Sequence, residues 1–317
     1  MKKEVILGID TSNYTTSLAV MTREGELLAN IKRPLPVKAG ERGLRQSDAV
    51  FAHIKNLPSA FEEANEYISG RSLIAVGVSE KPRNVQGSYM PCFLSGVSAA
   101  TAAAASASVP LYRFSHQCGH IMAAIYSSGN LGLLDSDFVA FHISGGTTEM
   151  LSVHPDGNAF KADLIGGTKD LNAGQIIDRI GVKMGFGFPC GPEIERHALA
   201  FSGEIPKKKI SRDGLCVNLS GLENMALKLY SDTEDRGLVS KFTLGYICNA
   251  ITEMSDEYLR LKGKTHFVYA GGVMSNSIIK KHLSERFECS FAEPAMSADN
   301  AVGISYLTKR AHEKNRI

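Results

Sequence analysis

The sequence predicts a mixed α/β protein that contains one structural unit twice. Residues 4–29 and 137–162 share a pattern: an apolar run, a turn rich in small and hydroxyl residues, a second apolar run and a Gly before a third run. Matching residues lie 132 positions apart, as Ser12 and Ser144 do. A repeat at nearly half the chain length indicates two copies of one sheet, although chance similarity between two hairpins is an alternative.

Each copy of the repeat predicts three strands, because its apolar runs are separated by turn residues. In the segment between the copies, the spacing of apolar residues distinguishes helices from strands. The predictions for that segment, in order, are a helix at 46–68, a strand at 72–79, a loop at 81–92, a helix at 93–107, a strand at 109–115 and a helix that begins at 116.

After the second copy, helical spacing dominates, and Gly or Pro residues mark where elements begin and end. Pro192 stands at a position that the first turn of a helix accepts. The predictions are helices at 171–186, 188–201, 219–232, 239–263 and 299–315, a polar and basic loop at 202–214, and a strand leading into a turn at 265–277.

Composition and charge exclude several classes of protein. The chain has 317 residues, 44% of them apolar, and a formal net charge of +2 that by itself does not indicate nucleic-acid binding. Its six Cys residues form no CxxC pair, which argues against a cysteine zinc site and a disulfide-stapled secreted domain. No apolar run is long enough for a membrane span or a signal peptide. We therefore expect a cytoplasmic protein with no membrane or DNA partner.

Two His residues four positions apart, His116 and His120, stand at the start of the helix predicted from residue 116. On a helix such residues lie on one face about 6 Å apart, so two imidazoles can bind one metal ion. Two ordinary polar residues at the mouth of a helix are the alternative. Gln117 stands where a zincin peptidase has its general-base Glu, so proteolysis is disfavoured.

Three turns rich in Gly and polar residues follow predicted strands, at residues 10–13, 144–148 and 271–276. Backbone N–H groups in such turns can approach phosphate oxygens, because no bulky side chain intervenes. None of them has the spacing of a Walker loop or of the GxGxxG motif. Each could be only a tight turn, but three of them on a duplicated α/β scaffold predict a nucleotide-binding cleft.

Five motifs follow one another along the chain: HQCGH, HISGGTTEM, GGTKDLNAGQIIDRIGVKMGFGFPCGPEIE, YAGGVMSNS and SADNAVGIS. In this order and spacing, and over nearly its whole length, the chain resembles the TsaD family of tRNA threonylcarbamoyladenosine synthases, once labelled sialoglycoprotein endopeptidases. The resemblance implies the two-lobed fold shared by actin, sugar kinases and Hsp70 (the ASKHA fold), which agrees with the internal repeat. The implied lobes are residues 1–133, ending in the HxxxH helix, and 134–317, whose last helix could pack on the first lobe.

The resemblance also implies an activity and partners. The family transfers threonylcarbamoyl from threonylcarbamoyl-AMP to N6 of adenosine 37 in tRNAs that read codons beginning with A. No protein nucleophile is required, because an amine attacks an activated carbonyl while AMP departs; the protein orients both reactants and stabilises developing charge. Family members work with TsaB-like and TsaE-like subunits, so tRNA and such subunits are the expected partners.

Site residues follow from the same resemblance. A metal ion, iron or zinc, would be held by His116, His120 and Asp299, and this set suits both metals. His142 is either a further ligand or a buried structural histidine. The residues implied to hold an adenine nucleotide (threonylcarbamoyl-AMP, AMP or ATP) are Ser144, Gly145, Gly146 and Thr147 at the phosphate, and Asp178, Gly191, Glu195 and Asn276 at the ribose and adenine.

Departures from the family pattern leave alternatives open. Segments 10–16 and 81–92 differ from it, Leu171 replaces an aspartate, and Glu223 stands where a lysine is customary. The chain is therefore either a synthase of this kind, a divergent carbamoyl or acyl transferase with another acceptor, or a non-catalytic nucleotide-binding subunit. The HxxxH pair favours retained catalysis.

RNA contact in this chain is predicted at one basic segment. The loop at 202–214 carries three consecutive lysines, Lys207 to Lys209, and then Arg212. These side chains could face RNA, because Lys and Arg neutralise phosphates. A solvated surface run is the alternative.

Overall fold

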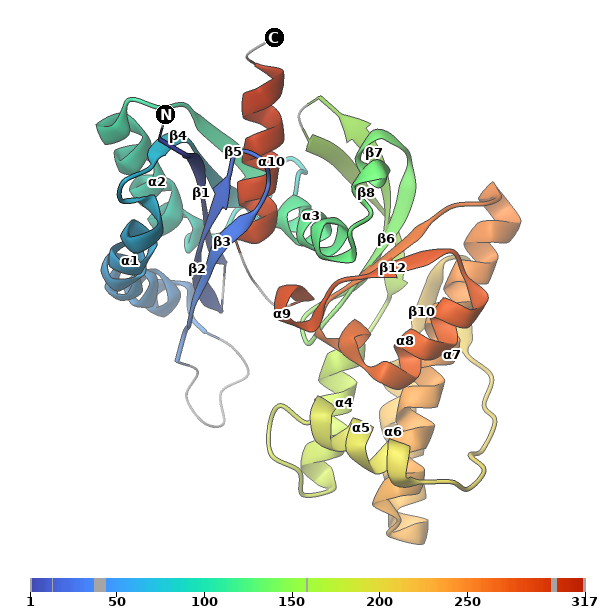
Figure 1. The fold of residues 1–317 in the computed structure, drawn as a ribbon. Helices are drawn as coiled ribbons and strands as arrows, with labels where there is room; N and C mark the ends of the chain where they lie inside the picture. Colours follow the sequence, from blue (N-terminus) through green and yellow to red (C-terminus); the bar gives the residue numbers. More distant parts are fainter. Residues whose placement is uncertain (1, 13, 37–43, 158, 298–300, 316–317) are drawn as a thin grey trace. The chain divides into compact units, whose positions relative to one another are not determined.

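The computed structural model describes residues 2–12, 14–36, 44–157, 159–297 and 301–315. The chain divides into two compact units, which Figure 1 shows coloured along the sequence. One unit comprises Met1–Asp135, His154–Ala162 and Ala298–Ile317, and the other comprises Ser136–Val153 and Asp163–Ser297. Each unit is built around one mixed sheet, so the predicted α/β class is confirmed.

The sheet of the first unit has the order β3-β2-β1-β4-β5 among the described residues. β1 lies at its centre, antiparallel to β2 and parallel to β4. All but the first residue of β1 are buried, as its long apolar run predicts. The strands are β1 (Glu4–Ser12), β2 (Thr15–Thr22), β3 (Leu27–Pro34), β4 (Ser72–Lys81) and β5 (Leu111–Ser115).

Helices pack on the two faces of this sheet. The helices of this unit are α1 (Gln46–Ile68), α2 (Phe93–Ala107), α3 (His116–Ser128), the short η1 (Leu131–Asp135) and α10 (Val302–Lys314). Side chains alternate along β1, so Leu7 and Ile9 join the core cluster that includes buried residues of α1 and α2. Gly8 faces the other way, and a Cβ there would lie 2.6 Å from the backbone N of Ser305 on α10.

The sheet of the second unit has the order β12-β11-β6-β7-β8-β10-β9 within the described chain. Its strands are β6 (Phe138–Ile143), β7 (Thr148–Asp156), β8 (Ala159–Thr168), β9 (Ser211–Asp213), β10 (Cys216–Asn218), β11 (Phe267–Ala270) and β12 (Cys289–Phe291). The loop predicted at 202–214 is wrong at its end, because Ser211–Asp213 pairs with β10 as β9. All three residues of β9 are exposed and polar, so no apolar alternation announces the strand.

The two sheets repeat one another residue by residue. Thr11 lies opposite Thr16 in β1 and β2, and Ile143 lies opposite Thr148 in β6 and β7, so both members of the pair are shifted by 132 residues. The strand order β3-β2-β1-β4-β5 also recurs as β8-β7-β6-β11-β12. The duplication predicted from the sequence is therefore present in both register and topology.

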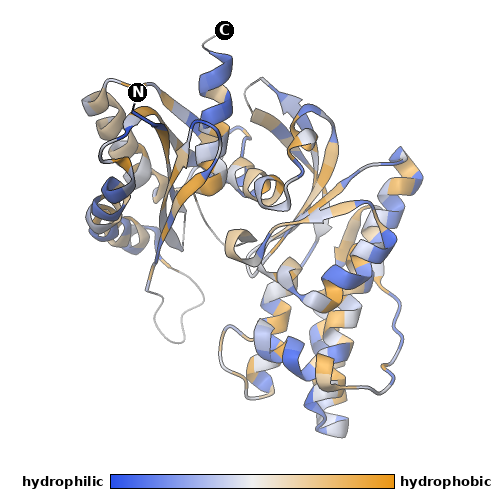
Figure 2. Cartoon of the chain, viewed as in Figure 1, coloured by the Kyte–Doolittle hydropathy of each residue, from blue (hydrophilic) through white to orange (hydrophobic). Residues whose placement is uncertain are grey.

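Helices of the second unit bury their apolar sides against its sheet and against each other. Figure 2 shows strands that are largely hydrophobic beside helices whose hydrophobic and hydrophilic residues alternate. Phe141, Phe267 and Tyr269 form the aromatic centre of this core, with Phe267 and Tyr269 stacked at 6.1 Å between ring centroids. The helices are α4 (Ala173–Lys183), α5 (Gly191–Ala200), α6 (Ser220–Thr233), α7 (Arg236–Lys262), η2 (Gly272–Ser275), α8 (Ser277–Arg286) and α9 (Pro294–Ser297).

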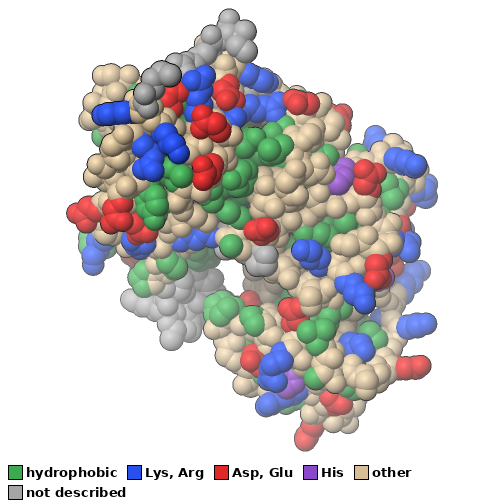
Figure 3. Space-filling model, in the orientation of Figure 1, with side chains coloured by type: hydrophobic (Ala, Val, Ile, Leu, Met, Phe, Trp, Pro, Cys, Tyr) green, Lys and Arg blue, Asp and Glu red, His purple; other side chains and the backbone are tan. Residues whose placement is uncertain are grey.

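The surface agrees with the balanced composition. Lys and Arg side chains are interspersed with Asp and Glu side chains over the face shown in Figure 3. Among the described residues, no helix combines the length and the apolar character that crossing a membrane requires.

Candidate active site

The two predicted metal-binding histidines lie side by side at the start of α3. The helix begins directly after β5, and the Ser115 hydroxyl caps it by accepting a hydrogen bond from the backbone N of Cys118 at 3.3 Å. This cap sets where the helix starts, and the spacing then places His116 and His120 on one face. Their Nε2 atoms are 2.9 Å apart.

This pair fits one metal ion. A tetrahedral ion bound about 2.0–2.1 Å from each nitrogen would separate the two nitrogens by about 3.3 Å, so the rings need to open by only a few tenths of an ångström. The predicted third ligand, Asp299, lies outside the described residues. Within the described part of the chain, no group of three or more His, Cys, Asp or Glu side chains could hold a metal ion.

Asp10, the first residue of the predicted turn at 10–13, lies beside the histidines, although the sequence assigned it no role at the metal site. Asp10, at the end of β1, is fully buried, and its Oδ1 lies 2.9 Å from Nδ1 of His116. The Ser79 hydroxyl on β4 also donates to this carboxylate. One signal was available, because Asp10 is an acidic residue at the end of a buried strand and occupies the repeat position of His142.

Close contact between α3 and α10 holds the histidine helix. A Cβ on Gly303 would lie 1.9 Å from the carbonyl oxygen of Gly119, and a Cβ on Gly119 would lie 2.9 Å from Cδ1 of Ile304. The two helices can cross at this distance only because both positions lack side chains. His120 follows Gly119 directly, so the close crossing of α3 and α10 fixes the position of the histidine pair relative to α10.

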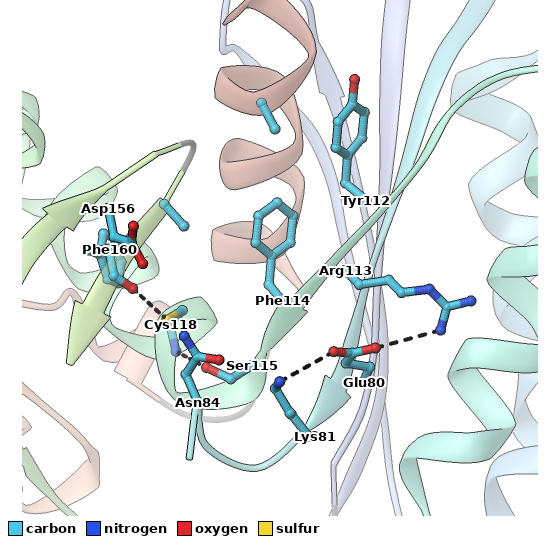
Figure 4. Close-up of a pocket in the computed structure, with 12 residues that line it drawn as sticks. Glu80, Lys81, Asn84, Tyr112, Arg113, Phe114, Ser115, Cys118, Asp156 and Phe160 are labelled. Atoms are coloured by element: carbon cyan, nitrogen blue, oxygen red, sulfur yellow. Dashed lines mark hydrogen bonds and ion pairs between the residues drawn. The ribbon is translucent and has the colours of Figure 1, made fainter. Parts of the chain in front are cut away.

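The opposite face of α3 borders a cavity of about 240 Å³ inside the first unit (Figure 4). Cys118 points into this region, and its Sγ donates to the carbonyl of Phe160 at 3.4 Å. Burial raises the pKa of the Cys118 thiol to about 11. The thiol is therefore protonated at neutral pH and serves packing rather than nucleophilic chemistry.

The predicted phosphate turn lies in the second unit, directly after β6. The backbone N of Ser144 donates to the carbonyl of Thr147 at 2.8 Å and closes the turn. Gly145 and Gly146 are exposed, and a Cβ on either would meet no atom within 4 Å. An anion could thus approach the backbone of both glycines from open space.

The N-terminus of α4 supports this turn from behind. The backbone N of Ala173 donates to Oγ1 of Thr148 at 2.9 Å, and that of Gly174 donates to the carbonyl of Ser144 at 3.2 Å. A Cβ on Gly174 would lie 2.7 Å from Gly145 N. The turn and the positive end of the α4 dipole therefore lie together, an arrangement that favours a negative ligand.

Of the other four predicted nucleotide residues, Asp178 and Glu195 each accept a hydrogen bond from a residue next to one of the remaining two. Oδ1 of Asp178 on α4 accepts from the backbone N of Cys190 at 2.8 Å, next to Gly191 at the start of α5. Oε1 of Glu195 on α5 accepts from the backbone N of Ser277 at 2.7 Å, beside Asn276. Their second carboxylate oxygens have no hydrogen-bond partner among the described residues.

Two further contacts fix residues of this group in the second unit. Oδ1 of Asn276 accepts from the backbone N of Ile278 and of Ile279, both at 3.1 Å, and so caps α8. Burial raises the pKa of Asp178, although the hydrogen bond from Cys190 opposes this. Gly271 has φ of +99°, and a Cβ there would lie 2.3 Å from the carbonyl oxygen of Ile143, so η2 starts close against the end of β6.

Comparison with known proteins assigns the chain to a family. The model of the TsaD family, tRNA N6-adenosine threonylcarbamoyltransferase, matches residues 28–306. The chain belongs to this family. A tRNA N6-adenosine threonylcarbamoyltransferase of Streptococcus agalactiae is 30% identical over 90% of this chain and 84% of its own length. One of Jannaschia is 28% identical over 98% of this chain and 89% of its own length.

The TsaD assignment agrees with the fold. Full-length HypF in its phosphate- and nucleotide-bound form matches 99% of this chain with a TM-score of 0.61 and 13% sequence identity. This chain spans about half of that protein, 47% of its length. The likeness shows the ASKHA fold alone. Both the family and the fold class predicted from the sequence are confirmed, and the chain is a transferase by family.

One departure from the TsaD pattern, Glu223, has a partner in this chain, and the retained Asp170 beside the altered Leu171 caps α6. Glu223 on α6 pairs with Arg179 on α4 at 3.0 Å, so its reversed charge is neutralised locally. Asp170 accepts from the backbone N of Leu219 at 2.8 Å and of Ser220 at 3.1 Å at the start of α6. Burial alone would raise the pKa of Asp170, but hydrogen bonds from Ser220, Leu219 and Leu171 outweigh it and lower the pKa to about 2.

The basic loop contains one arginine that forms ion pairs and three lysines that are exposed to solvent. Arg212 lies 3.2 Å from a carboxylate oxygen of Glu257 and 3.5 Å from one of Glu253. Lys207, Lys208 and Lys209 are exposed and form no ion pair with any described residue. Of the predicted RNA-facing residues, the three lysines are therefore better placed to meet a phosphate than Arg212.

His142 lies on β6 in the second unit, where it pairs with Glu149 on β7 and Ala270 on β11. It is partly buried. A contact between His142 and the metal stays a prediction.

A Gly174→Ala substitution tests the phosphate turn. The added Cβ would clash with the backbone of the turn, and overpacking of this kind costs about 1–3 kcal/mol. We expect affinity for AMP or a non-hydrolysable ATP analogue, measured by calorimetry, to fall about tenfold. Gly221→Ala is the matched control, because a Cβ on this α6 residue would meet nothing within 4 Å. Equal affinities for the two variants would show that the turn does not hold the nucleotide.

Proposed function

We propose that this chain uses a divalent metal ion, iron or zinc, to transfer threonylcarbamoyl from threonylcarbamoyl-AMP to N6 of adenosine 37 in tRNAs that read codons beginning with A. The reaction would take place in the cytoplasm, where such tRNAs work. The observation that carries the proposal is the 2.9 Å approach of His116 Nε2 and His120 Nε2 in a chain of the TsaD family. Asp299 is the proposed third ligand.

The proposed chemistry balances without a protein nucleophile. The N6 nitrogen of adenosine bonds to the carbamoyl carbon, the bond from that carbon to the phosphate oxygen of AMP breaks, and the proton that N6 loses passes to solvent water. When bound, the metal would polarise an oxygen of the adenylate as a Lewis acid. The chain's own task is to hold both reactants in line and to stabilise charge.

Residues of the second unit suit the adenylate. The open backbone of Gly145 and Gly146 would receive the phosphate, as the N-terminus of α4 lies behind it. Asp178 and Glu195 would each offer one carboxylate oxygen to ribose hydroxyls, since the described residues bond only the other oxygen. Asn276, fixed by its cap on α8, would meet the rest of the nucleoside.

The names of the relatives and three exposed lysines support tRNA as the proposed acceptor. The relatives are named as transferases acting on tRNA. Lys207, Lys208 and Lys209 offer exposed charge that no described carboxylate neutralises, as phosphate contacts require. We expect TsaB-like and TsaE-like subunits to assemble with this chain for full activity.

Deletion of the gene in its host tests the acceptor. We expect threonylcarbamoyladenosine, measured by mass spectrometry in digested tRNA, to disappear and to return when the wild-type gene is restored. A gene encoding His116→Ala should not restore it. Unchanged levels after deletion would contradict the proposed acceptor and favour a transferase acting on another molecule. Full rescue by His116→Ala would contradict the metal dependence.

A further inference from the structure

A pocket of about 200 Å³ lies within the second unit, between the basic loop and α7. Its wall on α7 is formed by residues that recur three or four positions apart and so share one face of the helix: Phe242, Gly245, Tyr246 and Asn249. The loop contributes Ile205, Pro206, Lys207 and Lys208. Pockets for drug-sized ligands measure about 300–1,000 Å³, so this smaller one suits a group such as a single nucleobase.

Contacts within the unit hold the loop over this face of α7. At one end of the loop, Nζ of Lys241 donates to the carbonyl of Phe201 at 2.9 Å, and at the other end Ile210 is buried in the core. In between, Ile205 packs so closely on α7 that a Cβ on Gly245 would lie 2.9 Å from its Cδ1. A proline with its fixed φ follows Ile205, so the lysines after it extend from a defined point of the backbone.

The charge around this pocket is positive. As the structure describes it, the lining contains two lysines and no carboxylate. Lys207 and Lys208 are exposed, and neither forms an ion pair with a described residue. Farther along α7, Glu253 and Glu257 are already paired with Arg212. The pocket therefore favours an anionic ligand, and two adjacent lysines suit the phosphates of a nucleic acid backbone.

Asn249 favours a nucleotide over an acidic peptide. Its side chain is exposed and forms no hydrogen bond with a described residue. The amide presents an acceptor oxygen beside two N–H donors, which match the neighbouring donor and acceptor on the edge of a base. An acidic side chain needs donors only. Ile205 and Pro206 add apolar surface of the kind on which the face of a base packs.

From these observations we infer that the pocket binds one unpaired nucleotide of the RNA acceptor. The base enters between the loop and α7, Asn249 hydrogen-bonds to its edge, and Lys207 and Lys208 contact the neighbouring phosphates. A paired base is excluded, because its edge is already used and both its faces are stacked. The inference rests on the tRNA acceptor proposed above and adds a contact outside the predicted metal and nucleotide residues.

Binding of an unmodified transcript of a tRNA that reads a codon beginning with A tests the pocket. Its Kd is measured by fluorescence anisotropy at several salt concentrations. We expect Asn249→Ala to raise the Kd about tenfold and to leave the salt dependence unchanged, because the substitution removes a base contact and no charge. Lys208→Ala should reduce the slope of log Kd against log salt by about one, since one phosphate contact is lost.

Asn65→Ala and Lys264→Ala are the matched controls. Asn65 is exposed on α1 in the first unit. Lys264 is exposed just beyond the end of α7, about 20 Å from Asn249 along the helix axis. Both variants should keep the wild-type Kd and salt slope. A loss in Asn65→Ala equal to that in Asn249→Ala would overturn the inference, because the effect would not belong to the pocket.

Two other ligands distinguish the occupant. We expect the affinities for AMP, by calorimetry, and for poly-L-glutamate, a polyanion without bases, to be the same in the wild type and in Asn249→Ala. If Asn249→Ala weakens AMP and leaves the transcript unaffected, the pocket is a site for a free nucleotide. If it weakens poly-L-glutamate equally, the pocket is a peptide site. Either result overturns the inference.

The outcomes also separate the inference from the proposed function. Suppose that deletion of the gene leaves threonylcarbamoyladenosine unchanged while Asn249→Ala still weakens binding of the transcript. The proposed reaction then fails, and the RNA pocket stands. If the deletion abolishes threonylcarbamoyladenosine but folded Asn249→Ala binds the transcript as tightly as the wild type, the reaction stands and the pocket is overturned.

Discussion

Replacing His120 with alanine is expected to abolish stoichiometric metal binding and to lower kcat/KM for threonylcarbamoyl transfer about a thousandfold. The physical reason is that the remaining described ligand, His116, cannot hold a divalent ion alone, and a metal acting as a Lewis acid contributes several kcal/mol to the transition state. His116→Ala should behave alike. Metal content by atomic emission and the rate of transfer to tRNA are the measurements.

His282→Ala is the control for this pair. His282 is exposed on α8 in the second unit, so its loss tests whether any histidine substitution lowers activity. We expect wild-type metal content and rate. If His120→Ala keeps one bound metal per chain and a near-normal rate, the paired imidazoles are not the metal site, and the proposed mechanism fails with them.

Gly303→Ala is expected to damage the metal site without touching a ligand. The new Cβ would meet the carbonyl oxygen of Gly119 at 1.9 Å, which the helices can relieve only by moving apart. Overpacking of a close-packed interior costs about 1–3 kcal/mol and sometimes more. We expect the free energy of unfolding, measured in urea, to fall by at least this amount, together with the affinity for Zn²⁺, because α3 carries both histidines.

Gly132→Ala is the matched control in the same unit. A Cβ at this position of η1 would meet nothing within 4 Å. We expect little change in stability and none in metal affinity. Wild-type stability of Gly303→Ala would show that α3 and α10 are not held by this crossing, and normal metal affinity in a destabilised protein would separate helix packing from the site.

Much of the secondary structure could be predicted because the signals are local. The helices predicted at 46–68 and 93–107 agree with α1 and α2 residue for residue. In such segments the apolar residues recur with the period of a helix, and this signal can be recognised without knowing which elements the helix packs against. Predictions failed where no periodic signal exists, as at β9, whose three residues are all exposed.

In the candidate site, too, local features could be predicted and contacts between distant residues could not. The turn at Ser144 could be located because it repeats the turn at Ser12, and the HxxxH pair could be located because four residues bring two side chains to one helix face. The contact between His116 and Asp10 could not be predicted, because the two residues lie 106 positions apart along the chain. Glu223 is likewise an unbalanced charge in the sequence, because Arg179, which pairs with it, lies 44 residues away along the chain.

By itself the sequence determined the α/β class, the duplication, the family and the order of the elements, because periodicity and motifs are properties of neighbouring residues. Only the tertiary structure decided which distant groups meet. It placed the Asp10 carboxylate against His116, the glycines of α3 and α10 against one another, and Glu195 against Ser277. Such meetings depend on how whole elements pack, since a close-packed interior admits only the pairs whose shapes and charges complement one another.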